Sequence, residues 1–307
     1  MAPATREKVE AAIKELGYRK NPLAGGLVAG RTNLLGLLVP DSSNAFFSEL
    51  SRDFELEAHQ RGYLTLLGNT NYDSATEMEY LQAFADLRAA GTVVASIGPE
   101  LHVDPEPPRV YVHSQPSGSR GASVHLADRS GAVVVVEHLL GHGYEQVDCV
   151  TGPGEHGPAA ERVRGWQDAM TKAGRRGEVH TVSFDRTTAR GELADVFAEQ
   201  PPPRALFATT DELALAAIDA LASIGCAVPD DVAVAGFDGI RDALFGRPQL
   251  TTMKAPIREL AHRALDALLA WDDWGHDCAE VLEPALVVGS TCGCRPDAAS
   301  SEVVDRR

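Results

Sequence analysis

The sequence predicts an α/β protein made of two doubly wound parallel-sheet lobes. From residue 34 onward, short apolar runs alternate with longer segments of helical periodicity. The alternation begins again near residue 146, after one complete set of elements. The 307 residues are 44% hydrophobic and 23% charged, which is enough apolar material for two cores of ordinary size.

The first set of elements opens on LLGLLVP, an uninterrupted apolar run typical of a strand buried on both faces of a parallel sheet. The helix that follows is predicted to end at Gly62, because glycine favours helix C-termini. The Pro-rich stretch 99–108 predicts a loop. The predicted strands are 34–40, 63–69, 92–97, 109–113 and 123–128, and the predicted helices are 44–61, 75–90 and 130–141.

The second set repeats the order of strand and helix. Its predicted strands are 146–152, 179–184, 205–210 and 232–238, and its predicted helices are 159–173, 188–199 and 211–224. After LTTMKAP (250–256) a last helix runs to about residue 271, and EPALVVGS (283–290) predicts a closing strand. We assign residues 34–142 and 257–282 to the first lobe and residues 143–256 and 283–295 to the second. The polar tail 296–307 is predicted to be disordered.

A short basic helix precedes the two lobes. Val9, Ile13 and Leu16 form one apolar stripe, and a helix this short has nothing of its own to bury that stripe against. The first 33 residues carry a net charge of +3, so the remainder of a chain of net charge −16 carries −19. Contact with nucleic acid is therefore expected only at this front end.

The cysteines and histidines predict no metal site. Five cysteines are too few and odd in number for a disulfide framework, and they fit a reducing cytoplasm. Cys292 and Cys294 form a single C-x-C, and His138 and His142 are spaced i, i+4 on a predicted helix. Each pair alone supplies two ligands where zinc sites use three or four, so we expect neither metal nor cofactor.

No motif predicts catalysis or a membrane span. The turn GPGEHG (152–157) matches neither phosphate-binding fingerprint, and the chain has no G-x-S-x-G. We therefore expect no catalytic residues. No apolar run reaches the length of a bilayer, and the front lacks a secretory signal, so a cytoplasmic protein without membrane contact is expected. The adjacent Phe46 and Phe47 suit either stacking on a ligand ring or packing in the core.

Several motifs together resemble the lactose-repressor (LacI/GalR) family of bacterial transcription regulators. They are PATREKVEAAIKELGY (3–18), NPLA (21–24), GRTNLLGLLVPDSSNAFFSEL (30–50), LGHGYEQV (140–147), TTDELALAA (209–217), VAVAGFD (232–238) and LTTMKAP (250–256). The resemblance implies a core of periplasmic-binding-protein type I, preceded by a DNA-binding headpiece and a hinge. It also implies a homodimer that reads operator DNA, usually as a repressor, and a cleft for a sugar, sugar derivative or nucleoside effector.

The front departs from the family pattern. Residues 1–20 match only the third helix of a helix-turn-helix headpiece, and residues 21–33 match the hinge. Either the start at Met1 is assigned too late, or the chain is a headless small-molecule-binding module that does not bind DNA. As written, the chain is expected to bind operator DNA poorly. The resemblance assigns hinge contacts with DNA to Asn21, Leu23, Ala24, Leu27 and Arg31, with Leu27 as the minor-groove wedge.

The resemblance also assigns the effector site. The predicted residues are Phe46, Phe47, Asp128, Arg162, Thr210, Asp211 and Asp238. Arg162 and Asp238 are the principal anchors, since charged groups make strong hydrogen bonds to hydroxyls or a carboxylate. Replacing Arg162 with alanine is expected to abolish effector binding and to leave the fold intact.

Overall fold

The structure, a computed structural model, describes residues 32–95, 108–113, 121–271 and 278–294, together with positions 5, 6, 11, 12 and 15. Most of the front helix, the hinge from 21 to 31 and the tail from 295 lie outside the described residues. The hinge contacts predicted for Asn21, Leu23, Ala24, Leu27 and Arg31 therefore stay predictions.

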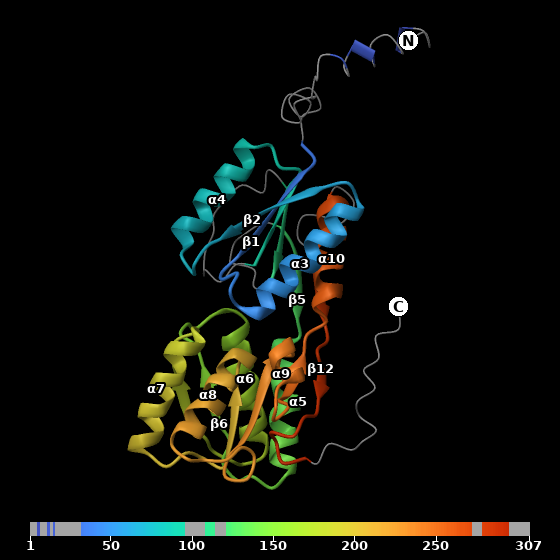
Figure 1. The fold of residues 1–307 in the computed structure, drawn as a ribbon. Coiled ribbons are helices and arrows are strands. Elements are labelled where there is room, and N and C mark those ends of the chain that lie inside the picture. Colours follow the sequence, from blue (N-terminus) through green and yellow to red (C-terminus); the bar gives the residue numbers. More distant parts are fainter. Residues whose placement is uncertain are drawn as a thin grey trace.

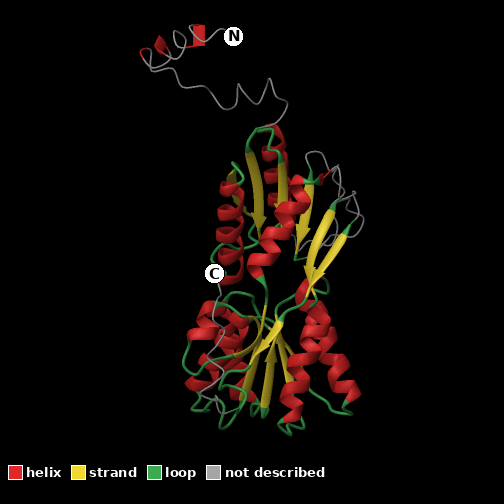
Figure 2. Ribbon diagram, turned by 90° about the vertical axis from the view of Figure 1, so that its right-hand side faces the viewer, coloured by secondary structure: helices red, strands yellow, loops and turns green. Residues whose placement is uncertain are grey.

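The first lobe is a six-stranded parallel sheet between helices (Figures 1 and 2). Its strand order is β11-β5-β4-β3-β1-β2. Helices α3 and α10 pack together on one face, and α4 covers the other. The elements are β1 (Leu34–Val39), α3 (Ala45–Gln60), β2 (Leu64–Asn69), α4 (Ser74–Asp86), β3 (Gly91–Val94), β4 (Arg109–Val112), β5 (Ala122–Leu126), α10 (Ile257–Leu269) and β11 (Ala279–Leu282).

The second lobe repeats this design with strand order β12-β10-β9-β8-β6-β7. All its pairings are parallel except that of β12 with β10. Helices α5 and α6 form one layer, and α7 and α8 form the other. The elements are α5 (Asp128–Gly141), β6 (Asp148–Thr151), α6 (Gly157–Lys172), β7 (Val179–Thr181), α7 (Arg186–Glu199), β8 (Ala205–Ala208), α8 (Asp211–Ser223), β9 (Ala233–Asp238), α9 (Arg241–Phe245), β10 (Thr251–Lys254) and β12 (Ala285–Val287).

Local sequence explains where the helices begin. The side chains of Asn44, Asp73, Asp185 and Thr210 each accept a hydrogen bond from a backbone N–H two or three residues ahead, at the starts of α3, α4, α7 and α8. Such N-caps satisfy amides that have no partner inside the helix. None of the described helices is long and apolar enough to cross a membrane.

Helix α5 corrects the predicted lobe boundary. We assigned residues up to 142 to the first lobe, yet α5 packs against α6 and against strands β8, β9, β10 and β12 of the second. The chain therefore crosses at Ala127, whose N–H donates to the carbonyl of Leu282 at another crossing. The prediction failed because α5 follows β5 directly in the sequence, and no break in the alternation of strands and helices marks the change of lobe. The short elements α9 and β11 were also not predicted.

Three crossings between the lobes lie within or next to the described residues. The crossings lie between β5 and α5, between β10 and α10, and between β11 and β12. The carboxyl ends of the parallel strands border this junction, which is where doubly wound sheets bind ligands.

Candidate functional site

The centre of the candidate site is a buried ion cluster around Arg162 on α6. Its Nε donates to Asp128 Oδ1 at 2.7 Å, and its Nη1 donates to Asp238 Oδ1 at 2.8 Å and to the carbonyl of Thr209 at 2.7 Å. The guanidinium carbon lies 3.8 Å from the centre of the Phe237 ring. We call Arg162, Asp128 and Asp238 the Arg162 cluster. It brings together the start of α5, the first turns of α6 and the end of β9, as the sequence predicts.

One nitrogen of this cluster is left over. Arg162 is 1% exposed, and its Nη2 has no hydrogen-bond partner among the described residues. A buried charged donor without a partner is costly, and a water or a polar group of a ligand would satisfy it. The Arg162 cluster thus has the geometry of an incomplete polar site.

Burial sets the protonation behaviour of the two carboxyls. It raises the pKa of Asp238 to about 6 even though Arg162 opposes the shift. Burial also raises the pKa of Asp128, again against the effect of Arg162. The two carboxyl groups flank one guanidinium, so the protein itself compensates the positive charge while both are ionised.

Asp211 and Thr210 make hydrogen bonds within the protein, and their predicted contact with the effector stays a prediction. Asp211 Oδ2 accepts from the backbone N–H groups of Gly239 and Ile240 at 2.7 and 2.9 Å, and its Oδ1 accepts from the Thr252 hydroxyl at 2.6 Å. Thr210 caps α8 through the N–H of Leu213. The protein itself thus engages both carboxylate oxygens of Asp211. Asp211 therefore holds the turn after β9, directly next to Asp238 in the chain, and so helps to position Asp238.

Phe46 and Phe47 are both buried, at 2% and 4% exposure. They pack on each other edge to face, with ring centres 5.2 Å apart, and both contact the ring of His113. Two adjacent helix residues can both be buried here because α3 begins at the junction of the lobes, where the apolar core continues from one lobe into the other. Their contacts support core packing beside the site.

Two aromatic residues that the sequence analysis missed meet across the junction. Tyr72 follows β2 in the first lobe, and Phe184 follows β7 in the second. Their rings are stacked, with centres 5.8 Å apart and an interplanar angle of 4°. Both residues follow the carboxyl end of a strand, and that position is the signal that could have found them.

His113 is the third residue that was missed. It follows β4, and its Nδ1 is buried without a partner among the described residues. Burial, together with the nearby charge of Arg162, lowers the pKa of His113 to about 3. His113 and Asp128 line a cavity of about 750 Å³ at the starts of α5 and α6. A neutral imidazole therefore borders the Arg162 cluster.

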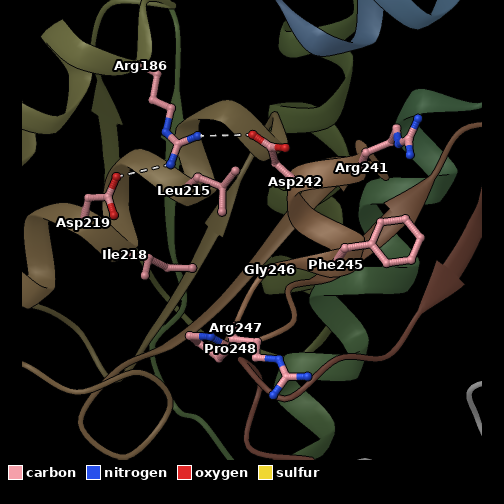
Figure 3. A pocket seen from close by; sticks show the side chains of 10 residues that line it. All are labelled: Arg186, Leu215, Ile218, Asp219, Arg241, Asp242, Phe245, Gly246, Arg247 and Pro248. Carbon is pink, nitrogen blue, oxygen red and sulfur yellow. Dashed lines mark hydrogen bonds and ion pairs between the residues drawn. The ribbon is translucent and has the colours of Figure 1, made fainter.

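A second cavity, of about 600 Å³, lies in the second lobe between α8 and α9 (Figure 3). Arg186 reaches across it to Asp219 at 3.3 Å and to Asp242 at 3.9 Å. Phe245 lies at its rim and is 77% exposed. This cavity contains none of the predicted effector residues.

One group of donor side chains in the described part of the chain could hold a metal ion. It consists of His138, His142, Cys292 and Cys294. It involves the last turns of α5, at the far end of that helix from Asp128.

Comparison with protein families and known sequences agrees with this architecture. A family model described as a periplasmic binding protein-like domain matches residues 136–292. The ribose operon repressor of Escherichia coli (strain K12) is 32% identical over 283 residues, which cover 88% of this chain and 84% of that protein. The HTH-type transcriptional repressor PurR of Vibrio vulnificus (strain CMCP6) is 30% identical over 305 residues, which cover 95% of this chain and 90% of that protein.

A solved structure extends the similarity to the fold. The structure titled a putative transcriptional regulator of the LacI family, from Sanguibacter keddieii, aligns with a TM-score of 0.78 at 28% identity. The alignment covers 85% of this chain and 99% of that one. The architecture of both lobes is therefore shared with regulators of one family.

Proposed function

Because the chain belongs to the LacI/GalR family of transcription regulators, we propose that it is a ligand-responsive transcription regulator whose cleft binds a neutral sugar or nucleoside. Its relatives of known name are repressors, which supports repression as the output and a regulator rather than an enzyme. The proposal also includes a cytoplasmic location, since operator DNA is the partner of such regulators.

The observation that carries the effector class is the charge balance of the Arg162 cluster. Two carboxylates face one guanidinium, so the site offers several acceptors and one free donor, Arg162 Nη2. Sugar hydroxyls donate to carboxylates and accept from a guanidinium. A phosphate or carboxylate would add negative charge where two carboxylates are already buried. The cluster therefore favours a neutral polyhydroxylated ligand over an anionic one.

The rings of Tyr72 and Phe184 favour the proposal of a ligand that contains a ring. Tyr72 and Phe184 stack on each other across the junction, one from each lobe. A sugar or base ring would stack on one of them in place of the other, once the two lobes move apart. A ligand that contacts residues of both lobes stabilises one relative position of the lobes over another. In the proposed mechanism this preference is transmitted to the hinge and the DNA-binding headpiece, which couples the two sites.

A thermal-shift screen with matched pairs tests the effector class. The screen compares D-ribose, other free sugars and nucleosides with the corresponding sugar phosphates and nucleotides. We expect a neutral member to raise the melting temperature, because a ligand that binds only the folded state stabilises it. A larger shift with the phosphorylated partner would contradict the proposal.

A matched pair of variants locates the site. Asp238→Asn should lower the affinity for the active compound about tenfold to hundredfold, the expected effect of losing a hydrogen bond to a charged group. Asp219→Asn, in the separate cavity of Figure 3, should leave it unchanged. Equal affinity of the two variants would place the effector elsewhere.

The DNA-binding part of the proposal rests on the family and on the net charge of +3 in the first 33 residues. A gel shift with the 307-residue chain, and with a version extended by a complete headpiece, tests it. We expect specific operator binding at physiological salt only for the extended version. Nanomolar sequence-specific binding by the 307-residue chain would contradict this expectation.

A further inference from the structure

Four metal-binding side chains converge at the end of α5. His138 lies in the last turn of this helix and His142 is its C-cap residue, and Cys292 and Cys294 lie in the segment that follows β12. In sequence the two pairs are separated by about half the chain, and for this reason neither predicts a metal site by itself. Figure 1 shows α5 beside β12 in the lower lobe, where the fold brings the pairs together.

The distances match tetrahedral coordination. His138 Nε2 lies 3.3 Å from Cys292 Sγ and 3.8 Å from Cys294 Sγ, and Cys294 Sγ lies 3.2 Å from His142 Nε2. All four donor atoms lie within 4.8 Å of one another. With Zn–S bonds of about 2.3 Å and Zn–N bonds of about 2.0–2.1 Å, a tetrahedral zinc site separates sulfur from nitrogen by about 3.5 Å and sulfur from sulfur by about 3.8 Å.

The protein holds the C-x-C segment in place. Cys292 is fully buried in the apolar cluster of the second lobe. Its carbonyl accepts a hydrogen bond from the Tyr144 hydroxyl at 3.3 Å. The intervening Gly293 has a φ of +93°, a left-handed conformation that favours glycine and reverses the chain between the two sulfurs. The side chain of Thr291 accepts from the N–H of Thr251, which ties the segment to β10.

We propose that His138, His142, Cys292 and Cys294 bind one zinc ion. Two thiolates and two imidazoles in a tetrahedron are a donor set that zinc prefers over calcium, magnesium or manganese. All four positions are filled by the protein, so the ion has a structural role and no open position for a substrate. It fastens the segment after β12 to the end of α5.

Metal titration of the full chain tests this site. The reduced, chelator-treated protein is titrated with Zn²⁺ against a chromophoric chelator, and bound metal is counted by elemental analysis. We expect one tightly bound zinc per chain and a higher melting temperature with zinc than without it. Substitution with Co²⁺ should give the intense visible bands of tetrahedral cobalt together with thiolate-to-metal charge transfer. Absence of stoichiometric zinc, or a Co²⁺ spectrum without thiolate bands, would overturn the proposal.

Variants assign the ligands. Cys294→Ser and His142→Asn change partly or fully exposed side chains, so their fold should persist, as far-UV circular dichroism can verify. Both should lose stoichiometric zinc and the zinc-dependent rise in melting temperature. Cys226→Ser and Cys278→Ser are matched controls outside the cluster and should keep both. Zinc binding that survives Cys294→Ser, or a Cys292–Cys294 disulfide that persists in reductant and excludes zinc, would refute the assignment.

Discussion

Arg162 connects α5, α6 and β9 through hydrogen bonds to Asp128, Asp238 and the carbonyl of Thr209. Contrary to the sequence-based expectation, its replacement should not leave the fold intact. Arg162→Ala removes the cation between two buried carboxylates, and breaking a buried ion pair typically costs about 3–5 kcal/mol of unfolding free energy. Urea unfolding measures the loss.

Arg164 provides the control for this prediction. It lies on the same helix, is partly exposed and pairs with Glu161 at the surface. Arg164→Ala should cost less than about 1 kcal/mol, as is usual for exposed ion pairs. Similar losses for the two variants would show that the Arg162 cluster contributes no more than a surface pair.

His113 predicts a pH dependence of stability. Its pKa is about 3 in the folded protein, compared with about 6.5 for a free histidine. Between these two pKa values the unfolded chain binds a proton that the folded chain excludes. The unfolding free energy is therefore at its full value above about pH 6.5 and decreases as the pH falls toward 3. Between pH 7.5 and pH 5 the loss amounts to about 2 kcal/mol.

The variant His113→Asn isolates this effect. Asparagine does not titrate in this range and tolerates the φ of 75° found at this position. Urea unfolding measures the unfolding free energy at pH 7.5 and at pH 5. The decrease between these two pH values should be about 2 kcal/mol smaller in the variant than in the parent chain. Equal decreases would mean that His113 is protonated in the folded state.

At the residue scale, the sequence predicts the three residues of the Arg162 cluster. It does not distinguish them from Asp211, which holds the turn after β9 in place. Asp238 ends β9 and Asp211 follows β8 at the same edge of the sheet, so their positions in the sequence do not distinguish their roles. Only coordinates show that backbone amides and Thr252 occupy the oxygens of Asp211. The stacking of Phe184 on Tyr72 joins residues of different lobes, so no local pattern predicts that contact.

At the scale of elements, the packing of α5 on α6 depends on close approach at Gly165. A Cβ there would lie 2.2 Å from the carbonyl oxygen of Arg129 on α5. Gly165→Ala should therefore force the two helices apart and cost about 1–3 kcal/mol, as overpacking does. Thermal or urea unfolding measures the cost.

Helix α7 supplies the matched glycine. A Cβ at Gly191 would meet nothing within 4 Å. Gly191→Ala should be neutral or stabilising by up to about 1 kcal/mol, since alanine favours a helix interior. A Gly165→Ala variant as stable as Gly191→Ala would mean that the α5–α6 layer is loosely packed.

The elements that sequence missed are those with the weakest local signal. Helix α9 has five residues, too few to show a 3.6-residue period. Strand β11 has four residues, of which only Leu282 is buried, and it follows residues outside the described part of the chain. The longer elements were predicted because apolar runs and N-caps mark them independently of their partners. The lobe assignment of α5 depends instead on contacts that no local pattern records.

At the scale of the whole molecule, the family predicts a homodimer, and we expect its interface to include Phe245. At 77% exposure it is the most exposed large apolar side chain in the described part of the chain. Phe245→Arg should shift the chain from dimer to monomer in size-exclusion chromatography with light scattering. Val134→Arg, which alters an apolar residue of 46% exposure on α5, should remain dimeric. A dimeric Phe245→Arg variant would place the dimer contact on another face.

The return of the chain to the first lobe bears on synthesis at the ribosome. Strand β11 pairs with β5, and α10 packs over β3, β4 and β5, yet both elements follow all of the second lobe except β12 and the segment after it. While the second lobe emerges, the apolar face formed by Val93, Val110 and Val124 lacks its cover of Leu260, Ala264 and Leu265. The nascent first lobe therefore cannot complete its core until about nine-tenths of the protein has been translated, and the second lobe, although later in sequence, has nearly all of its strands first.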